Sequence, residues 1–275
     1  SETNDNNRQA VGFRQLNDRY MNAILTELER IQPKHGIDYG RKIPLQSIYF
    51  GGGTPSLAPV ESIAQILDRI IGKDAPFCLL EDVATTDDDS NTQQAAARTE
   101  ITMEMDPGTF DCNQLRALKR LGINRISLGV QSLDDAILQA MGRFHRRRDI
   151  LQAIKDIAAV YDDGQDEPVN YSIDLISGAP GLTLAKWVET LQEVTGSSSS
   201  SMPLFTPPPK HISIYDLQIE QGTVFDRWYG RTGNGGSANG GSNNQDRTSI
   251  LRLPTEEECA FMYKFAAGYL RAKSY

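Results

Sequence analysis

Short β-rich runs alternate with longer helical stretches along most of this 275-residue chain, and this alternation constrains the fold more than any other feature. In the longer stretches, apolar residues recur every three or four positions, as they do on one face of a helix. Strands that alternate with helices run parallel and are joined by right-handed crossovers. The sequence therefore predicts an α/β fold, either an open doubly wound sheet or a barrel. The runs predicted as strands are 45–50, 100–105, 125–130, 171–176 and 211–217.

Three tracts interrupt this pattern, at about 81–98, 195–209 and 231–246. The first carries three consecutive aspartates, the second five serines and three prolines, and the third is mostly Gly, Asn and Ser. Such tracts have too little apolar surface to offset the entropy of an ordered chain. We expect them to be disordered surface insertions without a catalytic role.

The composition excludes several classes of protein. A net charge of −8 argues against a nucleic-acid-binding surface, which needs an excess of basic residues. The three cysteines are far apart, so we do not expect the disulfide framework of a secreted protein. We expect a protein of a reducing compartment instead. No apolar run is long enough to cross a membrane.

Unusual residues gather where the predicted strands end, and ligands of parallel α/β folds bind at that edge. The first strand runs into Gly51, Gly52 and Gly53, followed by Thr54. Consecutive glycines let backbone N–H groups approach a carboxylate or a phosphate, although the same run also suits a tight turn.

The next three strands contribute polar side chains to the same edge. Glu104 and Asp174 lie inside otherwise apolar strands, and a buried carboxylate needs a partner or a cationic ligand. For Glu104, the alternative is an arginine partner beside an Asp-Pro-Gly turn. Gln131 follows the third strand, where it either binds a ligand or is satisfied within a loop. Arg143 opens a basic cluster whose other members, at 146–148, are expected to be a solvated helix start.

No metal-binding or nucleophilic motif is present. The three histidines (His35, His145 and His211) lack metal-ligand spacing, and the sequence contains no HExxH, CxxC or Gly-x-Ser-x-Gly. We therefore predict no catalytic residue and no metal ligand in this chain.

Taken together, these segments resemble the radical S-adenosylmethionine (SAM) proteins of the oxygen-independent coproporphyrinogen III oxidase family, in particular its HemW-like heme-chaperone branch. The glycine run with its neighbours is similar to the GGGTP segment of that family. The resemblance covers the chain outside the three insertions. Its main segments are 49–57, 104–109, 122–132, 141–145, 173–181, 211–223 and 253–270.

The resemblance implies a partial (β/α)6 barrel that binds SAM at its strand ends. Gly52, Gly53 and Thr54 would meet the methionine end of the cofactor. Glu104, Gln131, Arg143 and Asp174 would complete the pocket, with Glu104 on a cationic group. In the family, a 4Fe-4S cluster reduces SAM, and the resulting 5′-deoxyadenosyl radical abstracts hydrogen from the substrate.

One departure from the family concerns the cluster. Cys78, Cys112 and Cys259 do not match the CxxxCxxC loop that holds it. We expect residues 1–275 to be an internal fragment of the core domain, without the first barrel strand, the cluster loop or the C-terminal domain. We expect the cluster ligands to lie outside this chain, which alone would not perform radical chemistry.

Three functions follow as hypotheses. The first is a heme chaperone that binds SAM and a 4Fe-4S cluster and delivers heme to an acceptor hemoprotein. The second is a coproporphyrinogen III oxidase of porphyrin biosynthesis, and the third is a cluster-free barrel that acts as a binding protein. The expected compartment is the cytoplasm, with a mitochondrion or plastid left open.

Overall fold

The computed structural model describes residues 17–30, 42–83, 98–162, 164, 169–197, 205–229 and 251–275. The predicted insertion at 231–246 lies outside the described residues, as do residues 84–97 of the tract at 81–98 and residues 198–204 of the tract at 195–209. The chain divides into two compact units. The N-terminal unit comprises 1–104 with 113–125, and the C-terminal unit comprises 105–112 with 126–275.

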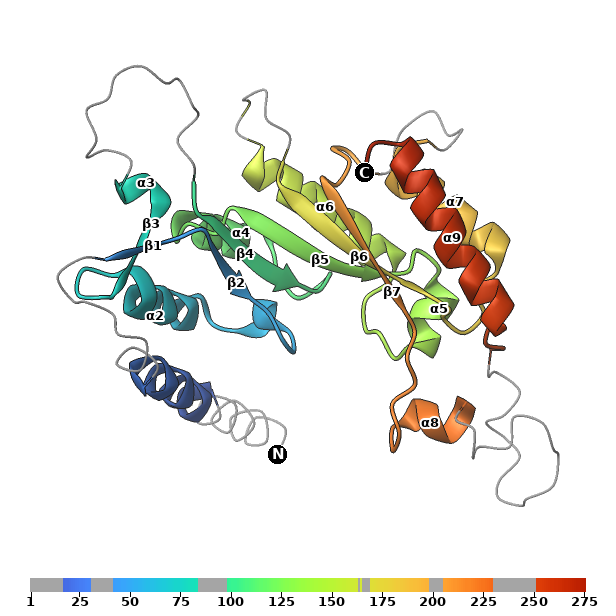
Figure 1. Cartoon of the computed structure of the whole chain (residues 1–275), viewed down its shortest axis with the longest axis horizontal. Helices are drawn as coiled ribbons and strands as arrows, with labels where there is room; N and C mark the ends of the chain where they lie inside the picture. Colours follow the sequence, from blue (N-terminus) through green and yellow to red (C-terminus); the bar gives the residue numbers. More distant parts are fainter. Residues whose placement is uncertain are drawn as a thin grey trace, which may run out of the picture. The chain divides into compact units, whose positions relative to one another are not determined.

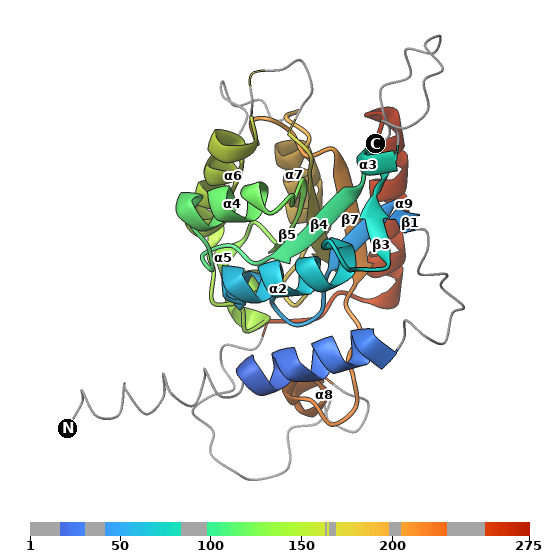
Figure 2. The same ribbon diagram turned by 90° about the vertical axis from the view of Figure 1, so that its left-hand side faces the viewer.

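The N-terminal unit contains two parallel strand pairs. β1 (Ile43–Leu45) pairs with β3 (Phe77–Leu79), and the two lie side by side in Figure 2. β2 (Ser47–Phe50) pairs with β4 (Glu100–Met105), with Tyr49 opposite Thr102. A helix spans residues 17–30. The other helices of this part of the chain are η2 (Pro55–Leu57), α2 (Val60–Ile71), α3 (Leu80–Val83) and α4 (Cys112–Arg120).

The C-terminal unit contains three parallel strands. β6 (Tyr171–Ser177) pairs with β5 (Arg125–Gln131) on one side and with β7 (His211–Asp216) on the other. Helices alternate with these strands along the chain. They are α5 (Asp135–Ala140), α6 (Arg147–Tyr161), α7 (Leu184–Val194), α8 (Val224–Tyr229) and α9 (Glu256–Ala272).

Buried apolar side chains form the core of each unit. On β4 and β5 most residues are buried, as expected for parallel strands covered on both faces. Helices α7 and α9 lie side by side (Figure 1), and the indole N–H of Trp187 donates to the carbonyl of Met262 at 3.0 Å. The α/β fold with parallel strands is therefore confirmed. Fully buried side chains include Ile101, Met103, Leu115, Leu118, Leu128, Val130, Ile150, Ile173, Leu175, Trp187 and Leu191.

The structure corrects the sequence prediction at four short segments. β1 and β3 were not predicted as a strand pair, and α8 was not predicted as a helix. Within the tract at 195–209, which was expected to be a surface insertion, Phe205 is 1% exposed and Tyr171 donates its hydroxyl to the carbonyl of Pro207 at 2.6 Å. That part of the tract packs because Phe205 supplies a large apolar ring within the Ser and Pro run.

Among the described residues, no helix is both long enough and apolar enough to span a lipid bilayer.

Candidate cofactor site

Each of the three glycines in the turn after β2 has a steric or a conformational role. A Cβ atom on Gly51 would lie 2.6 Å from Cε1 of Tyr49, so a larger residue there would displace the Tyr49 ring. Gly52 and Gly53 have φ angles of +85° and +64°, which L-residues rarely adopt. Space around both is open, so their role is conformational. The turn passes through Thr54 into η2, whose Ser56 carbonyl accepts from the Gln114 side chain at 2.8 Å.

Glu104 is held by two donors from β2 and the glycine turn. The Tyr49 hydroxyl donates to Oε1 at 2.8 Å, and the Gly52 N–H donates to Oε2 at 2.9 Å. The expected alternative, an arginine partner, is not what the structure shows. Within the described ranges, no ion pair involves Glu104, and Arg125 lies 3.6 Å from Glu100 instead. The Glu104 side chain is half-buried, so its remaining lone pairs can accept from a ligand cation.

Asp174 lies on β6 within a chain of hydroxyl groups. Ser172 donates to the Ser127 hydroxyl at 3.1 Å, and Ser127 donates to Oδ2 of Asp174 at 3.4 Å. The two serines are buried and Asp174 is half-buried. The serines therefore orient a carboxylate that is still partly accessible.

Gln131 ends β5 in an unusual backbone conformation. Its φ is +64°, in the left-handed region that a non-glycine residue rarely adopts. The ladder between β5 and β6 shifts register between Leu128 and Gln131, which is a β-bulge. In the described chain, no hydrogen bond involves the Gln131 side chain, so its amide is available to a ligand.

Arg143 lies in the loop between α5 and α6. Its N–H donates to the carbonyl of Leu138 at 2.9 Å, and its own carbonyl accepts from the Arg146 guanidinium at 2.6 Å. The Arg143 side chain is half-buried, and among the described residues no carboxylate lies within ion-pair distance of it. An anionic ligand group would complete its interactions.

The neighbouring arginines form the start of α6, as predicted, but only one of the three is largely solvated. The Arg146 guanidinium donates to the backbone carbonyl of His145, and Arg147 forms an ion pair with Glu193 at 2.8 Å. Only Arg148 is largely exposed, with its side chain 87% accessible. These contacts fix the loop that carries Arg143.

The predicted site residues thus form two groups, each within one unit. Gly52, Gly53, Thr54 and Glu104 belong to the N-terminal unit, and the first is hydrogen-bonded to the last. Gln131, Arg143 and Asp174 belong to the C-terminal unit. Sequence reasoning missed Tyr49, which was treated as a strand residue. The register of β2 against β4 could have indicated it, because Tyr49 pairs with Thr102, two residues before Glu104.

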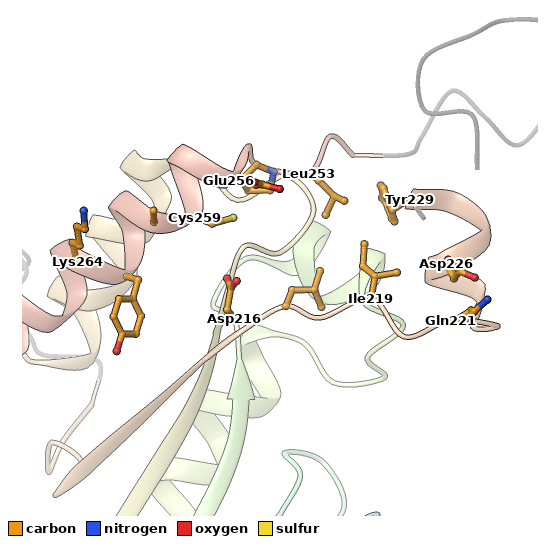
Figure 3. Close-up of a pocket in the computed structure, with 13 residues that line it drawn as sticks. Asp216, Ile219, Gln221, Asp226, Tyr229, Leu253, Glu256, Cys259 and Lys264 are labelled. Atoms are coloured by element: carbon orange, nitrogen blue, oxygen red, sulfur yellow. The ribbon is translucent and has the colours of Figure 1, made fainter. Parts of the chain in front are cut away.

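A cavity of about 1020 Å³ lies in the C-terminal unit beyond the end of β7 (Figure 3). Leu217, Ile219 and Leu253 contribute apolar surface, while Asp216 and Cys259 come from β7 and α9. Burial raises the pKa of the Cys259 thiol, and the negative charge of Asp216 raises it further. Cys259 is therefore a neutral thiol at pH 7.

Comparison with known proteins decides the family. Residues 17–194 match the sequence profile of the Radical SAM superfamily. The chain belongs to the radical SAM superfamily. It is 42% identical over 188 residues to a heme chaperone HemW from Synechocystis, covering 67% of this chain and 36% of that protein. It is also 30% identical over 180 residues to the mitochondrial radical S-adenosyl methionine domain-containing protein 1 of Bos taurus, covering 66% of this chain and 33% of that protein.

Two solved structures share the fold. The coproporphyrinogen III oxidase HemN of Escherichia coli superposes with a TM-score of 0.62 over 94% of this chain and 46% of its own, at 18% identity. An Elp3 protein of the archaeon Methanocaldococcus infernus superposes with a TM-score of 0.53 over 88% of this chain and 48% of its own, at 20% identity. The predicted partial radical SAM barrel is therefore confirmed as the fold class. The chain spans about a third to a half of the length of the curated relatives it matches.

The cysteines of this radical SAM chain do not form a cluster site. Cys78 lies on β3, Cys112 begins α4 and Cys259 lies on α9. Cys112 donates its thiol to Asp156 at 3.3 Å. Within the described ranges, no three His, Cys, Asp or Glu side chains gather as metal ligands.

Proposed function

We propose that this chain is the SAM-binding core of a heme chaperone of the HemW type, which carries heme to an acceptor hemoprotein. The observation that carries the proposal is the 42% identity with the Synechocystis heme chaperone over 188 residues. That stretch is two thirds of the chain, whereas the similarity to the coproporphyrinogen oxidase is one of fold, at 18% identity.

The chemistry of the two residue groups supports SAM as the ligand. The methionine end of SAM carries an ammonium and a carboxylate group. Glu104, with lone pairs left over from Tyr49 and Gly52, suits the ammonium group, and the Arg143 guanidinium suits the carboxylate. Asp174 and Gln131 can form hydrogen bonds with ribose hydroxyls. Gly53 and Thr54 continue the glycine turn, which the hydrogen bond from the Gly52 N–H to Glu104 holds in place.

The three cysteines do not fit a 4Fe-4S cluster, so we propose that its ligands belong to a longer protein of which this chain is part. The bound cluster would supply the electron that cleaves SAM. The residues of this chain would hold and orient the cofactor, and no step is assigned to them beyond binding. Relatives named as mitochondrial support a mitochondrion as the compartment, beside the cytoplasm that the sequence predicts.

The test uses the full-length protein, reconstituted with iron and sulfide under anaerobic conditions. We expect a shift of the heme Soret band on titration, transfer of heme to an apo-hemoprotein, and no conversion of coproporphyrinogen. Decarboxylation of coproporphyrinogen to protoporphyrinogen would instead establish the oxidase. If neither SAM nor the cluster binds, the chain is a cluster-free binding protein and the proposal is wrong.

A further inference from the structure

A buried histidine lies next to two of the proposed cofactor residues without being one of them. His145 is 6% exposed, and its Nε2 atom lies 3.4 Å from the backbone carbonyl of Val130 on β5. The residue comes from the loop between α5 and α6, two positions after Arg143. A polar ring buried in this place needs a reason, because its desolvation is costly without a partner.

The carbonyl that His145 contacts belongs to a strained turn. The Ser132 N–H donates to the same Val130 carbonyl at 2.7 Å, which closes a three-residue turn around Gln131. With a φ of +64° at Gln131, this is the classic γ-turn, which is rare and strained. Such a conformation persists only where surrounding contacts hold it. Residues strained in this way cluster at functional sites.

The turn determines where the Gln131 side chain lies. A Cβ atom on Gly129 would meet the Gln131 amide nitrogen at 3.0 Å and Oδ1 of Asp106 at 2.6 Å. The Gln131 amide and the Asp106 carboxylate therefore both lie against the bare Cα of Gly129. Relaxation of the turn would carry the amide away from this position.

The loop that bears His145 is itself braced. Gly142 has a φ of +72°, and the guanidinium of Arg146 donates to the carbonyls of Arg143 and His145 at 2.6 and 2.8 Å. The Arg146 N–H donates to Asp149 at 2.8 Å at the start of α6. A rigid loop can hold a strained turn in place, whereas a mobile one cannot.

The charge state of His145 is compatible with this role. Burial lowers its pKa, as does the nearby Arg143, while the Val130 carbonyl, Asp106 and Asp149 act in the opposite direction. With the pKa below its usual value, the ring is neutral at pH 7 and carries one N–H. Because a carbonyl only accepts, that proton is assigned to Nε2.

We propose that His145 is a positioning residue for cofactor binding: it ties the Arg143 loop to the Val130 carbonyl and thereby holds Gln131 in its ligand-binding conformation. This inference rests on the proposed function, because it takes SAM as the ligand. His145 itself contacts no cofactor in this account.

The test measures SAM affinity by equilibrium dialysis with the 275-residue chain and five variants. His145→Leu removes the donor and should weaken binding about tenfold, a typical effect of one lost hydrogen bond. His145→Gln retains an N–H donor near Nε2 and should restore affinity to within about twofold of wild type. His211→Leu, at an exposed histidine on β7, is the control and should bind as wild type does.

Gln131→Ala supplies the decisive comparison. If His145 acts through Gln131, the double variant His145→Leu/Gln131→Ala should bind no more weakly than Gln131→Ala alone. A full tenfold further loss in the double variant would mean that His145 acts by another route, and wild-type affinity in His145→Leu would equally overturn the proposal.

Hydrogen exchange of the Ser132 amide separates this inference from the proposed function, because it needs no ligand. We expect faster exchange in His145→Leu than in wild type or His145→Gln. If the wild-type chain binds no SAM, the proposed function fails, while the tie between His145 and the turn is still judged by this measurement. Unchanged exchange in His145→Leu overturns the tie.

Discussion

At the scale of single residues, Glu104 shows how a carboxylate on an apolar strand is kept ready for a ligand. Its two oxygens accept from different groups, the Tyr49 hydroxyl and the Gly52 N–H, so the carboxylate cannot rotate without losing a hydrogen bond. Tyr49 is 56% exposed, and burial of its ring does not explain its place on β2. Its contribution is therefore the hydrogen bond to Glu104.

Replacement of Tyr49 by Phe tests this contribution. The variant keeps the ring but loses the donor, so the dissociation constant for SAM should rise about three- to tenfold, the range for one hydrogen bond to a partly solvated charged group. Isothermal titration calorimetry measures the change. Tyr215→Phe, at another exposed tyrosine, should leave the affinity unchanged. Equal affinities of Tyr49→Phe and wild type would show that Gly52 alone is sufficient.

Cys259 gives a second prediction, which depends on its raised pKa. Burial is the largest cause and Asp216 the next, so the thiolate is scarce at pH 8 and alkylation by iodoacetamide should be slow. Asp216→Asn removes the charge, lowers the pKa of the thiol and should speed alkylation about threefold at pH 8. Peptide mass spectrometry follows Cys259 separately from the other two cysteines. Asp226→Asn, at another carboxylate that lines the same cavity, is the control, and an equal acceleration there would contradict the assignment to Asp216.

At the scale of elements, hydrophobic periodicity predicted most long helices and the central strands, because each is long enough to show its period. The exceptions are short. β1 and β3 have three residues each and α8 has six, so no period could be recognised in them. The Glu104 partner could not be read from spacing, since Tyr49 and Glu104 meet only through the register of β2 on β4. The γ-turn at Gln131 was equally hidden, because nothing in a Val-Gln-Ser sequence requires a positive φ.

Helix α9 permits a prediction about stability. The Glu258 N–H donates to the Thr255 hydroxyl at 3.2 Å, and the Thr255 N–H donates to Glu258 at 2.7 Å, which forms a capping box. Thr255→Ala removes half of it and should lower the free energy of unfolding by about 1 kcal/mol in urea denaturation. Thr26→Ala, within the helix at 17–30, removes a hydroxyl that caps nothing and is the control. Equal losses in both variants would exclude a specific role of the cap.

The acid dependence of this cap has a defined sign. The Thr255 N–H lowers the pKa of Glu258 below 4.5, and Arg252 lowers it further. A carboxylate with a lowered pKa stabilises the folded state above its unfolded pKa and loses that contribution as the pH falls. The stability difference between wild type and Glu258→Gln, which removes the carboxylate charge, should therefore be full at pH 7 and should shrink below about pH 4. A difference that grows on acidification would contradict the role of the Glu258 carboxylate.

At the scale of the whole molecule, the seven proposed cofactor residues are divided between two compact units, four in one and three in the other. Each group is organised by its own unit, through the glycine turn and β4 in the first case and through the β5 bulge and the Arg143 loop in the second. If one ligand engages both groups, loss of either must weaken its binding. SAM binding can then be measured on the 275-residue chain itself, and the measurement needs neither a bound 4Fe-4S cluster nor catalytic turnover.

Thermal unfolding with and without SAM provides that measurement. A ligand at 100 times its dissociation constant stabilises the folded state by about 2.7 kcal/mol, which for a chain of this size corresponds to a Tm increase of roughly 5 to 10 °C. Glu104→Gln, in the N-terminal unit, and Arg143→Gln, in the C-terminal unit, should each remove most of this increase at the same SAM concentration. Glu104→Gln preserves side-chain size, and within the described ranges Arg143 forms no ion pair that its replacement would break, so the Tm without ligand should stay close to that of wild type. An increase that is lost in one variant and retained in full in the other would show that only one group of residues binds SAM.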